Sequence, residues 1–126
     1  MRGLLDTSVF IAREQGRSIA SAPKEAAVSV MTLAELHIGV LAAADPEVRA
    51  ARLRTLAEVE RTFEPLPVDA QVARRFAEIV VEAKRGGRRL AVIDALIAAT
   101  GAALDVPVYT QGSDFEGLPG VRVIRV

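Results

Sequence analysis

The sequence contains no cysteine and no tryptophan, and it has a single histidine, His37. Without cysteine the chain cannot form a disulfide, a zinc ribbon, an iron–sulfur cluster or a thiol nucleophile. One histidine excludes a metal site with two histidine ligands, although His37 could still act alone as a base. Any metal site or hydrolytic centre must therefore be built mainly from oxygen-bearing side chains.

The chain also lacks an excess of charge of either sign and a long apolar run. Lys and Arg number 16, and Asp and Glu also number 16. A nucleic-acid partner would therefore require a local concentration of basic residues. Residues 1–5 reach Asp6 too early for a signal peptide, and no uncharged run approaches the ~20 apolar residues of a membrane span. We expect a cytoplasmic protein with no membrane partner.

The 126 residues, 51% hydrophobic and 25% charged, are typical of one globular domain spanning residues 1–126. Predicted strands alternate with helices, which indicates an α/β fold with a parallel sheet covered on both faces. The expected extended segments are 4–5, 26–30, 66–68, 106–109 and 121–126. The expected helices are 8–13, 32–44, 46–63, 70–85 and 92–104, where Asp45 and Asp69 are N-caps and Gly86 ends the fourth helix.

Two acidic residues directly follow predicted strands. Asp6 comes after the strand at 4–5, and Asp114 lies in the loop after the strand at 106–109. Ligands of parallel α/β sheets bind outside the carboxyl ends of the strands, so both acids fall where a site is expected. Each also has a structural interpretation, because Asp6 can cap the following helix and Asp114 can stabilise its turn.

Two further acids lie in apolar helices. Glu35 follows Thr32 by three residues, the spacing of a capping box, but its helix is apolar around most of its circumference. Asp94 is the one charged residue within 90–99. A buried carboxylate is costly unless it is paired or bound to a cation, although in a first helical turn it can also complement the helix dipole.

Together these four acids indicate a carboxylate cluster without histidine or cysteine. Ligands that are all oxygen favour hard cations, so we expect Mg²⁺, with Mn²⁺ as a substitute. Such a cation clamps phosphate oxygens and lowers the pKa of bound water, which suits hydrolysis of a phosphodiester. In this hypothesis Asp6 and Asp94 hold the principal ion, and the other two acids complete its shell or position water.

Four short motifs surround these acids. They are Leu4-Leu5-Asp6-Thr7-Ser8, Thr32-Leu33-Ala34-Glu35-Leu36, Ile93-Asp94-Ala95-Leu96-Ile97-Ala98 and Tyr109-Thr110-Gln111-Gly112-Ser113-Asp114-Phe115. In this order they resemble the PIN-domain ribonucleases, specifically the VapC toxins of toxin–antitoxin pairs. The resemblance spans the whole chain. It implies a three-layer fold with a central parallel sheet of about five strands, Mg²⁺-dependent RNA cleavage, a homodimer and inhibition by a VapB-type antitoxin.

By motif, the resemblance assigns the catalytic metal site to four residues: Asp6, Glu35, Asp94 and Asp114. It also assigns a supporting role to the hydroxyl of Thr110. One departure is Gly112, because similar sequences often carry Asp or Asn there. This departure motivates the alternative hypothesis of a catalytically weak PIN-fold binding or regulatory module that acts through its antitoxin partner. A receiver-like phosphoryl-transfer domain is disfavoured, because Asp6 has no second aspartate two residues later.

A basic segment, residues 84–89, precedes the helix of Asp94. Its arginines are candidates for contacts with the RNA backbone: Arg85, Arg88 and Arg89. The alternative is a solvated helix end whose cations suit the helix dipole. His37 lies about 200° around its helix from Glu35, so we expect it to face away from that carboxylate.

Overall fold

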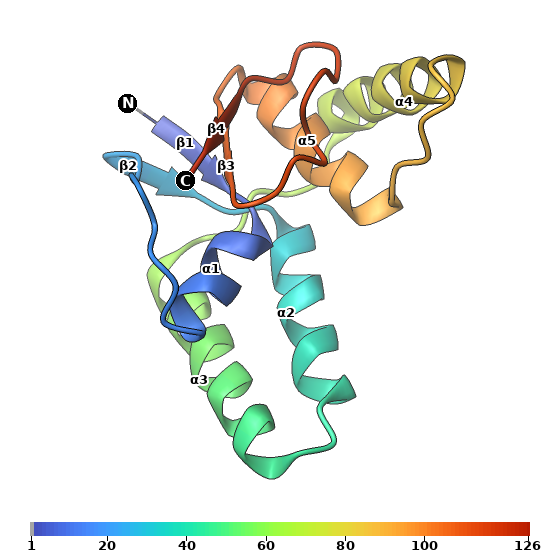
Figure 1. Cartoon of the computed structure of the whole chain (residues 1–126). Helices are drawn as coiled ribbons and strands as arrows, with labels where there is room; N and C mark the ends of the chain where they lie inside the picture. Colours follow the sequence, from blue (N-terminus) through green and yellow to red (C-terminus); the bar gives the residue numbers. More distant parts are fainter. Residues whose placement is uncertain (1) are drawn as a thin grey trace.

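The structure, a computed structural model, describes residues 2–126. Figure 1 shows the arrangement of its elements. Over these residues the elements in chain order are β1 (Arg2–Leu5), α1 (Thr7–Glu14), β2 (Glu25–Ala27), α2 (Val30–Ala42), α3 (Pro46–Thr62), α4 (Ala70–Arg85), α5 (Val92–Leu104), β3 (Val108–Thr110) and β4 (Val123–Arg125). The alternation of strands and helices confirms the predicted α/β class.

The sheet is parallel throughout, with the strand order β2-β1-β3-β4. It has four strands within the described residues rather than about five. The segment expected at 66–68 contributes one isolated parallel bridge, between Leu66 and Ser29. Proline has no backbone N–H, and Leu66 stands between Pro65 and Pro67, so the pairing cannot extend in either direction.

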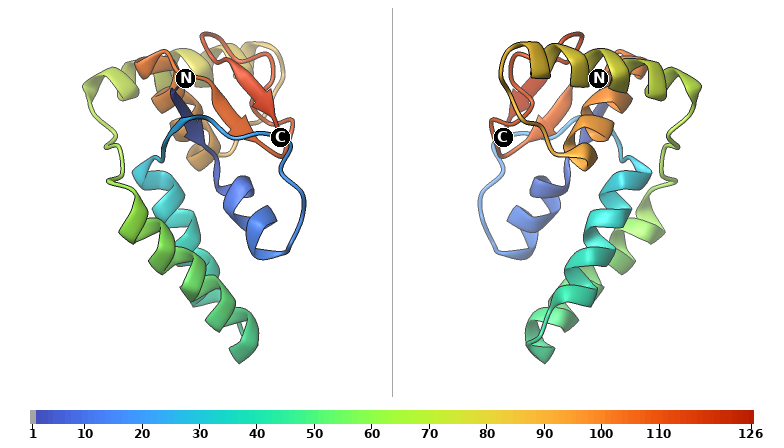
Figure 2. Two further views of the ribbon diagram at one scale, coloured as in Figure 1. Left: turned by 90° about the vertical axis from the view of Figure 1, so that its left-hand side faces the viewer. Right: turned by 90° about the vertical axis from the view of Figure 1, so that its right-hand side faces the viewer.

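Successive side chains of the two central strands, β1 and β3, point to opposite faces of the sheet and divide the core into two halves. Leu4 and Val108 point to the face covered by α4 and α5. Leu5 and Tyr109 point to the opposite face, where α1, α2 and α3 pack. The result is a three-layer structure with the sheet in the middle, and the α2–α3 pair extends beyond the sheet as an arm (Figures 1 and 2).

A glycine brings α5 close to the sheet. A Cβ atom at Gly101 would lie 2.8 Å from a methyl group of Val108, a distance that real Cβ atoms do not adopt. Gly101 therefore lets α5 pack directly on β3. This packing places the N-terminus of α5 near the carboxyl ends of the strands, where parallel sheets bind ligands.

The start of α2 differs from the prediction. Its N-cap is Ser29, whose side chain accepts a 3.0 Å hydrogen bond from the backbone N–H of Met31. Thr32 therefore lies within the first turn and is fully buried, so the expected capping box between Thr32 and Glu35 is wrong. The strand expected over 26–30 is correspondingly shorter and ends at Ala27. The carboxylate of Glu35 is thus not used to cap its own helix.

No helix within residues 2–126 has the length and apolar character needed to cross a membrane.

Candidate active site

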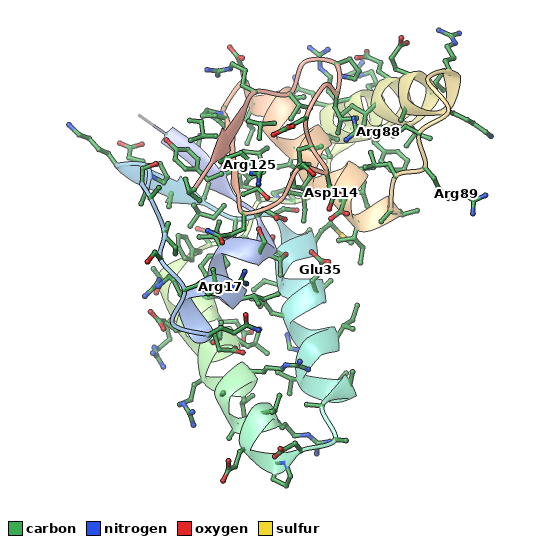
Figure 3. All side chains as sticks on the ribbon, in the orientation of Figure 1. Arg17, Glu35, Arg88, Arg89, Asp114 and Arg125 are labelled. Carbon is green, nitrogen blue, oxygen red and sulfur yellow. The ribbon has the colours of Figure 1, made fainter. Side chains whose placement is uncertain are left out.

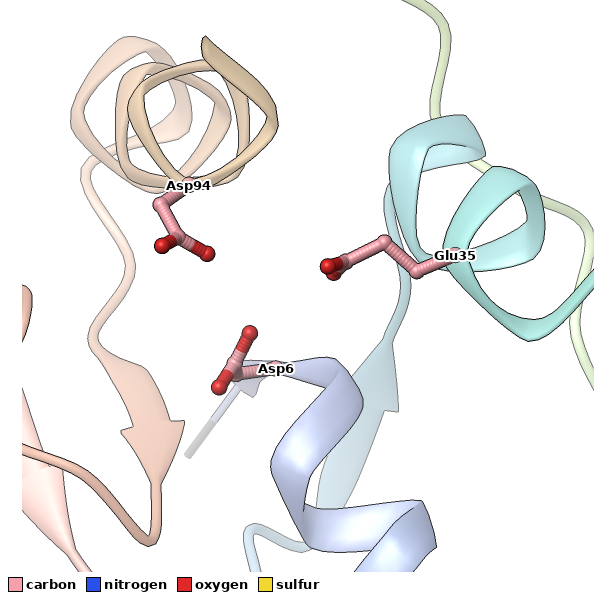
Figure 4. Close-up of side chains that lie close together, drawn as sticks. All are labelled: Asp6, Glu35 and Asp94. Carbon is pink, nitrogen blue, oxygen red and sulfur yellow. The ribbon is translucent and has the colours of Figure 1, made fainter. Parts of the chain in front are cut away.

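Three carboxylates that are far apart in the sequence meet at the carboxyl edge of the sheet. Asp6, Glu35 and Asp94 each offer a carboxylate oxygen, and these oxygens lie within 4.8 Å of one another (Figure 4). Asp6 follows β1, Glu35 comes from α2 on one face of the sheet, and Asp94 comes from the first turn of α5 on the other. The three layers of the fold therefore converge on one cluster.

Asp6 is buried, and one of its oxygens is held by three donors. Oδ2 accepts hydrogen bonds from the Ser8 hydroxyl at 2.7 Å, the Thr110 hydroxyl at 3.0 Å and the Ser8 backbone N–H at 3.4 Å. The last of these makes Asp6 the N-cap of α1. Within residues 2–126, no hydrogen bond engages Oδ1. Asp6 can therefore cap the helix with one oxygen and present the other to a ligand.

Glu35 is oriented by a residue for which the sequence predicted no role at the site. The hydroxyl of Thr7 donates a 2.6 Å hydrogen bond to Oε1 of Glu35. Burial raises the pKa of the Glu35 carboxyl, the hydrogen bond from Thr7 opposes this rise, and the charge of Asp6 adds to it. The adjacency of Thr7 to Asp6 was visible in the sequence, but its partner 28 residues away was not.

Asp94 has the most strongly perturbed acidity at the site. Burial raises its pKa to about 6, and the nearby charges of Glu35, Asp6 and Asp114 contribute to the rise in that order. These contributions have the same sign because all four groups are negative. None of the ion pairs within residues 2–126 involves Asp6, Glu35 or Asp94. An excess of negative charge of this kind is the condition under which a bound divalent cation stabilises a site.

Asp114 lies at the edge of this cluster and not inside it. It is exposed in the loop that follows β3, yet it is close enough to Asp94 to raise the pKa of that group (Figure 3). A Cβ atom at Gly112 would lie 3.9 Å from Oδ2 of Asp114. Position 112 therefore faces the fourth acid, and an Asp or Asn there would add an oxygen beside it.

The three arginines of the basic segment have different surroundings. Arg88 donates hydrogen bonds to the backbone carbonyls of Asp114 and Glu116. Arg85 forms an exposed 3.7 Å ion pair with Glu82. Arg89 is exposed and makes no hydrogen bond or ion pair with residues 2–126 (Figure 3). The side chain of Arg88 is thus engaged within the protein, whereas Arg89 is available to a ligand.

The chain matches a known protein family over most of its length. The family model described as "PIN domain" matches residues 3–121, and the chain belongs to this family. The resemblance inferred from the four motifs is therefore confirmed.

Relatives that match over nearly the whole chain carry more specific names. "Ribonuclease VapC5" of Mycobacterium tuberculosis is 48% identical, over 98% of this chain and 95% of its own. "Ribonuclease VapC4" of the same organism is 41% identical, over 99% of this chain and 97% of its own. A solved structure of VapBC-5, a member of the VapBC family of toxin–antitoxin systems from M. tuberculosis, superposes with a TM-score of 0.87 at 45% identity, covering 99% of this chain and 98% of that one.

Proposed function

We propose that this chain is a metal-dependent endoribonuclease and the toxin of a toxin–antitoxin pair, acting in the cytoplasm as a single PIN domain over residues 1–126. The observation that carries the proposal is the convergence of Asp6, Glu35 and Asp94 within 4.8 Å. It occurs in a chain that is 48% identical to a named ribonuclease over nearly its full length.

The donor set fits a hard divalent cation. All three clustered groups offer carboxylate oxygens, the ligands that Mg²⁺ and Mn²⁺ prefer. A bound Mg²⁺ ion would polarise the phosphodiester and lower the pKa of water that attacks in line. Asp6 and Asp94 are the principal ligands in this proposal.

Neighbouring side chains hold the carboxylates of Asp6 and Glu35 in position through hydrogen bonds. The hydroxyls of Ser8 and Thr110 donate to one oxygen of Asp6, and the other oxygen accepts no hydrogen bond from residues 2–126. Glu35, oriented by Thr7, completes the cation shell or accepts a proton from water. Asp114 supplies further negative charge from the neighbouring loop.

The proposed substrate is RNA, bound along the exposed cations beside the cluster. Arg85 and Arg89 are exposed and lie in the chain just before α5, and in this proposal they guide phosphates toward Asp94 in the first turn of that helix. Contacts of this kind position the backbone without reading bases. They also supply local positive charge in a chain whose formal net charge is zero.

The proposed partners are a VapB-type antitoxin and a second copy of this chain. Large apolar side chains stand exposed on the α2–α3 arm: Ile38 at 54%, Leu41 at 79% and Leu53 at 52%. Exposed apolar side chains that share one part of a fold, here a pair of helices, are typical of surfaces that a protein partner covers. The VapBC-5 structure is described as a member of a toxin–antitoxin family, which supports a partner of that kind here.

The direct test is cleavage of structured RNA by the purified protein with Mg²⁺, with EDTA and as the Asp6→Asn variant. Asparagine caps helices as well as aspartate does, so this variant should keep α1 while losing the metal ligand. Glu60→Gln, which removes an exposed carboxylate on α3, is the matched control. We expect cleavage only by the wild type and the control with Mg²⁺, and equal cleavage under all conditions would refute the metal mechanism.

The alternative of a regulatory module predicts a different outcome. Its basis is Gly112, which contributes no side-chain oxygen beside Asp114. A protein that binds Mn²⁺ and its antitoxin normally but turns over no RNA would favour this alternative. Co-expression with a short neighbouring open reading frame, followed by copurification, tests the antitoxin partnership in either case.

A further inference from the structure

Arg88 occupies a connecting position between two parts of the site. It lies in the segment between α4 and α5, where its own backbone N–H donates a 2.8 Å hydrogen bond to the carbonyl of Ala83. Its guanidinium reaches across to the loop after β3, and two of its nitrogens donate to the carbonyls of Asp114 and Glu116. The side chain therefore joins the end of α4 to the loop that carries the fourth acid.

The loop is also anchored by other contacts. At its start, the backbone N–H of Gln111 donates a 3.0 Å hydrogen bond to the Ser8 hydroxyl, and the Gln111 side-chain amide donates to the carbonyl of Val126. The Phe115 side chain is 2% exposed and belongs to the core beneath α4 and α5. Glu116 forms a 3.3 Å ion pair with Arg125 of β4, but both side chains are more than half exposed, so this pair contributes little. The backbone on either side of Phe115 is held by Arg88 alone among the charged side chains of residues 2–126.

The geometry of a guanidinium suits this role. Its N–H groups form a rigid planar fork, so one side chain can satisfy two carbonyls at a fixed separation. A lysine ammonium keeps the charge but is a compact group on a flexible stem and does not reproduce the fork. The two N–H groups that donate to these carbonyls are not available to a phosphate.

We propose that Arg88 is a positioning residue that clamps the loop 111–117 and so keeps Asp114 at the edge of the cation site, and that it is not an RNA contact. The part of this inference that concerns the cation rests on the proposed function. The part that concerns the loop rests on the hydrogen bonds alone. Arg89, the exposed neighbour, is the phosphate-binding residue of the pair.

The test compares Arg88→Ala and Arg88→Lys with the matched neighbour Arg89→Ala. Hydrogen–deuterium exchange of the segment 111–118 reports on the loop without RNA or metal. Losing two charge-assisted hydrogen bonds should speed exchange there by about tenfold in both Arg88 variants. Arg89→Ala should leave this exchange unchanged.

Two further measurements separate the clamp from an RNA contact. Calorimetry should show Mn²⁺ affinity about tenfold lower in both Arg88 variants and unchanged in Arg89→Ala, as for residues that orient metal ligands. RNA binding is measured at several salt concentrations with the catalytically impaired Asp6→Asn protein. Adding Arg89→Ala should reduce the slope of log K against log salt concentration by about 1. It should be unaffected by adding Arg88→Ala.

Several outcomes would overturn the proposal. Unchanged loop exchange in Arg88→Ala would show that no clamp exists. Faster exchange with unchanged Mn²⁺ affinity would show that the loop does not serve the cation. Arg88→Lys behaving as wild type while Arg88→Ala weakens only RNA binding would make Arg88 a phosphate contact. If Arg88→Ala fails to fold, judged by circular dichroism, the same measurements on Arg88→Lys decide the question.

Failure of the proposed function is distinguishable from failure of the clamp. Exchange and Mn²⁺ binding are both measured without RNA. A wild-type protein that shows the clamp and binds Mn²⁺ but cuts no RNA would refute the nuclease proposal and leave this inference standing.

Discussion

Replacing Asp94 with asparagine should stabilise the metal-free protein while abolishing its stabilisation by Mn²⁺. In the folded chain the Asp94 carboxylate is half-buried beside three other negative groups, Glu35, Asp6 and Asp114. Asparagine has nearly the same shape and no charge, so the substitution removes both the cost of burying a charge and this repulsion without leaving a cavity. The site is thus expected to trade stability for cation binding, as functional sites with perturbed acids often do.

The size of the effect follows from the pKa. A rise from 3.8 to about 6 corresponds to at most about 3 kcal/mol, at about 1.4 kcal/mol per pKa unit. The side chain is only half-buried, and screening by water reduces this to about 1.5 kcal/mol. The charge also interacts favourably with the N-terminus of α5, and losing that interaction costs about 0.5 kcal/mol. A net gain of about 1 kcal/mol remains, or ~4 °C in Tm for a domain of this size.

The sign of the pH dependence can be checked separately. Because the folded pKa of Asp94 is raised, the folded state binds this proton more tightly than the unfolded state does. The free energy of unfolding of the wild type therefore falls as the pH rises from 3.8 to about 6, because the folded protein must then carry the Asp94 charge. The advantage of Asp94→Asn over the wild type should accordingly be small near pH 4, grow up to about pH 6 and stay constant above it.

The assay is thermal unfolding followed by circular dichroism at pH 7.5 and pH 4, with EDTA or with Mn²⁺. At a Mn²⁺ concentration of about 100 Kd the wild type should gain about 2.7 kcal/mol, which reverses the order of the two proteins. The control Glu60→Gln, on the exposed face of α3, should have the same Tm as the wild type both in EDTA and in Mn²⁺. An Asp94→Asn protein that is no more stable than the wild type in EDTA at pH 7.5 would refute the reasoning.

Three other predictions concern neighbouring positions. Thr7→Val should lower kcat and Mn²⁺ affinity about tenfold with little change in KM, because it removes the 2.6 Å hydrogen bond to Glu35. Thr7→Ser keeps the hydroxyl and should retain both values, so an equal loss in Thr7→Ser would argue against orientation by the hydroxyl. Gly101→Ala should destabilise the protein by about 2 kcal/mol in urea unfolding, because its Cβ would lie 2.8 Å from a β3 methyl group; a neutral result would show that α5 can shift. Gly112→Asp should raise Mn²⁺ affinity several-fold in calorimetry by adding an oxygen beside Asp114, whereas Gly112→Ala should not.

Local sequence signals accounted for the long helices. The N-caps Asp45 and Asp69 and the C-terminal Gly86 mark α3 and α4 as they were predicted, within a residue. These signals work because capping is a contact between residues two or three positions apart. Such a contact depends little on the tertiary structure, so it can be predicted from the local sequence.

Short strands and competing caps were less predictable. Ser29 and Thr32 are both acceptable N-caps, and what selects Ser29 is the pairing of the backbone around it with Leu66, far along the chain. The lengths of β2 and β4 likewise depend on their partners, since a strand ends where its neighbour stops pairing.

For the site, the amino-acid pattern singled out four acids, and the folded arrangement brings three of them together. An uncompensated carboxylate in an apolar helix, such as Asp94, stands out from composition alone because burying it is costly. Its closeness to Asp6 and Glu35 requires helices from opposite faces of the sheet to converge. The partners of Thr7 and Arg88 lie 26 to 28 residues away in the chain, and no local pattern encodes contacts at that separation.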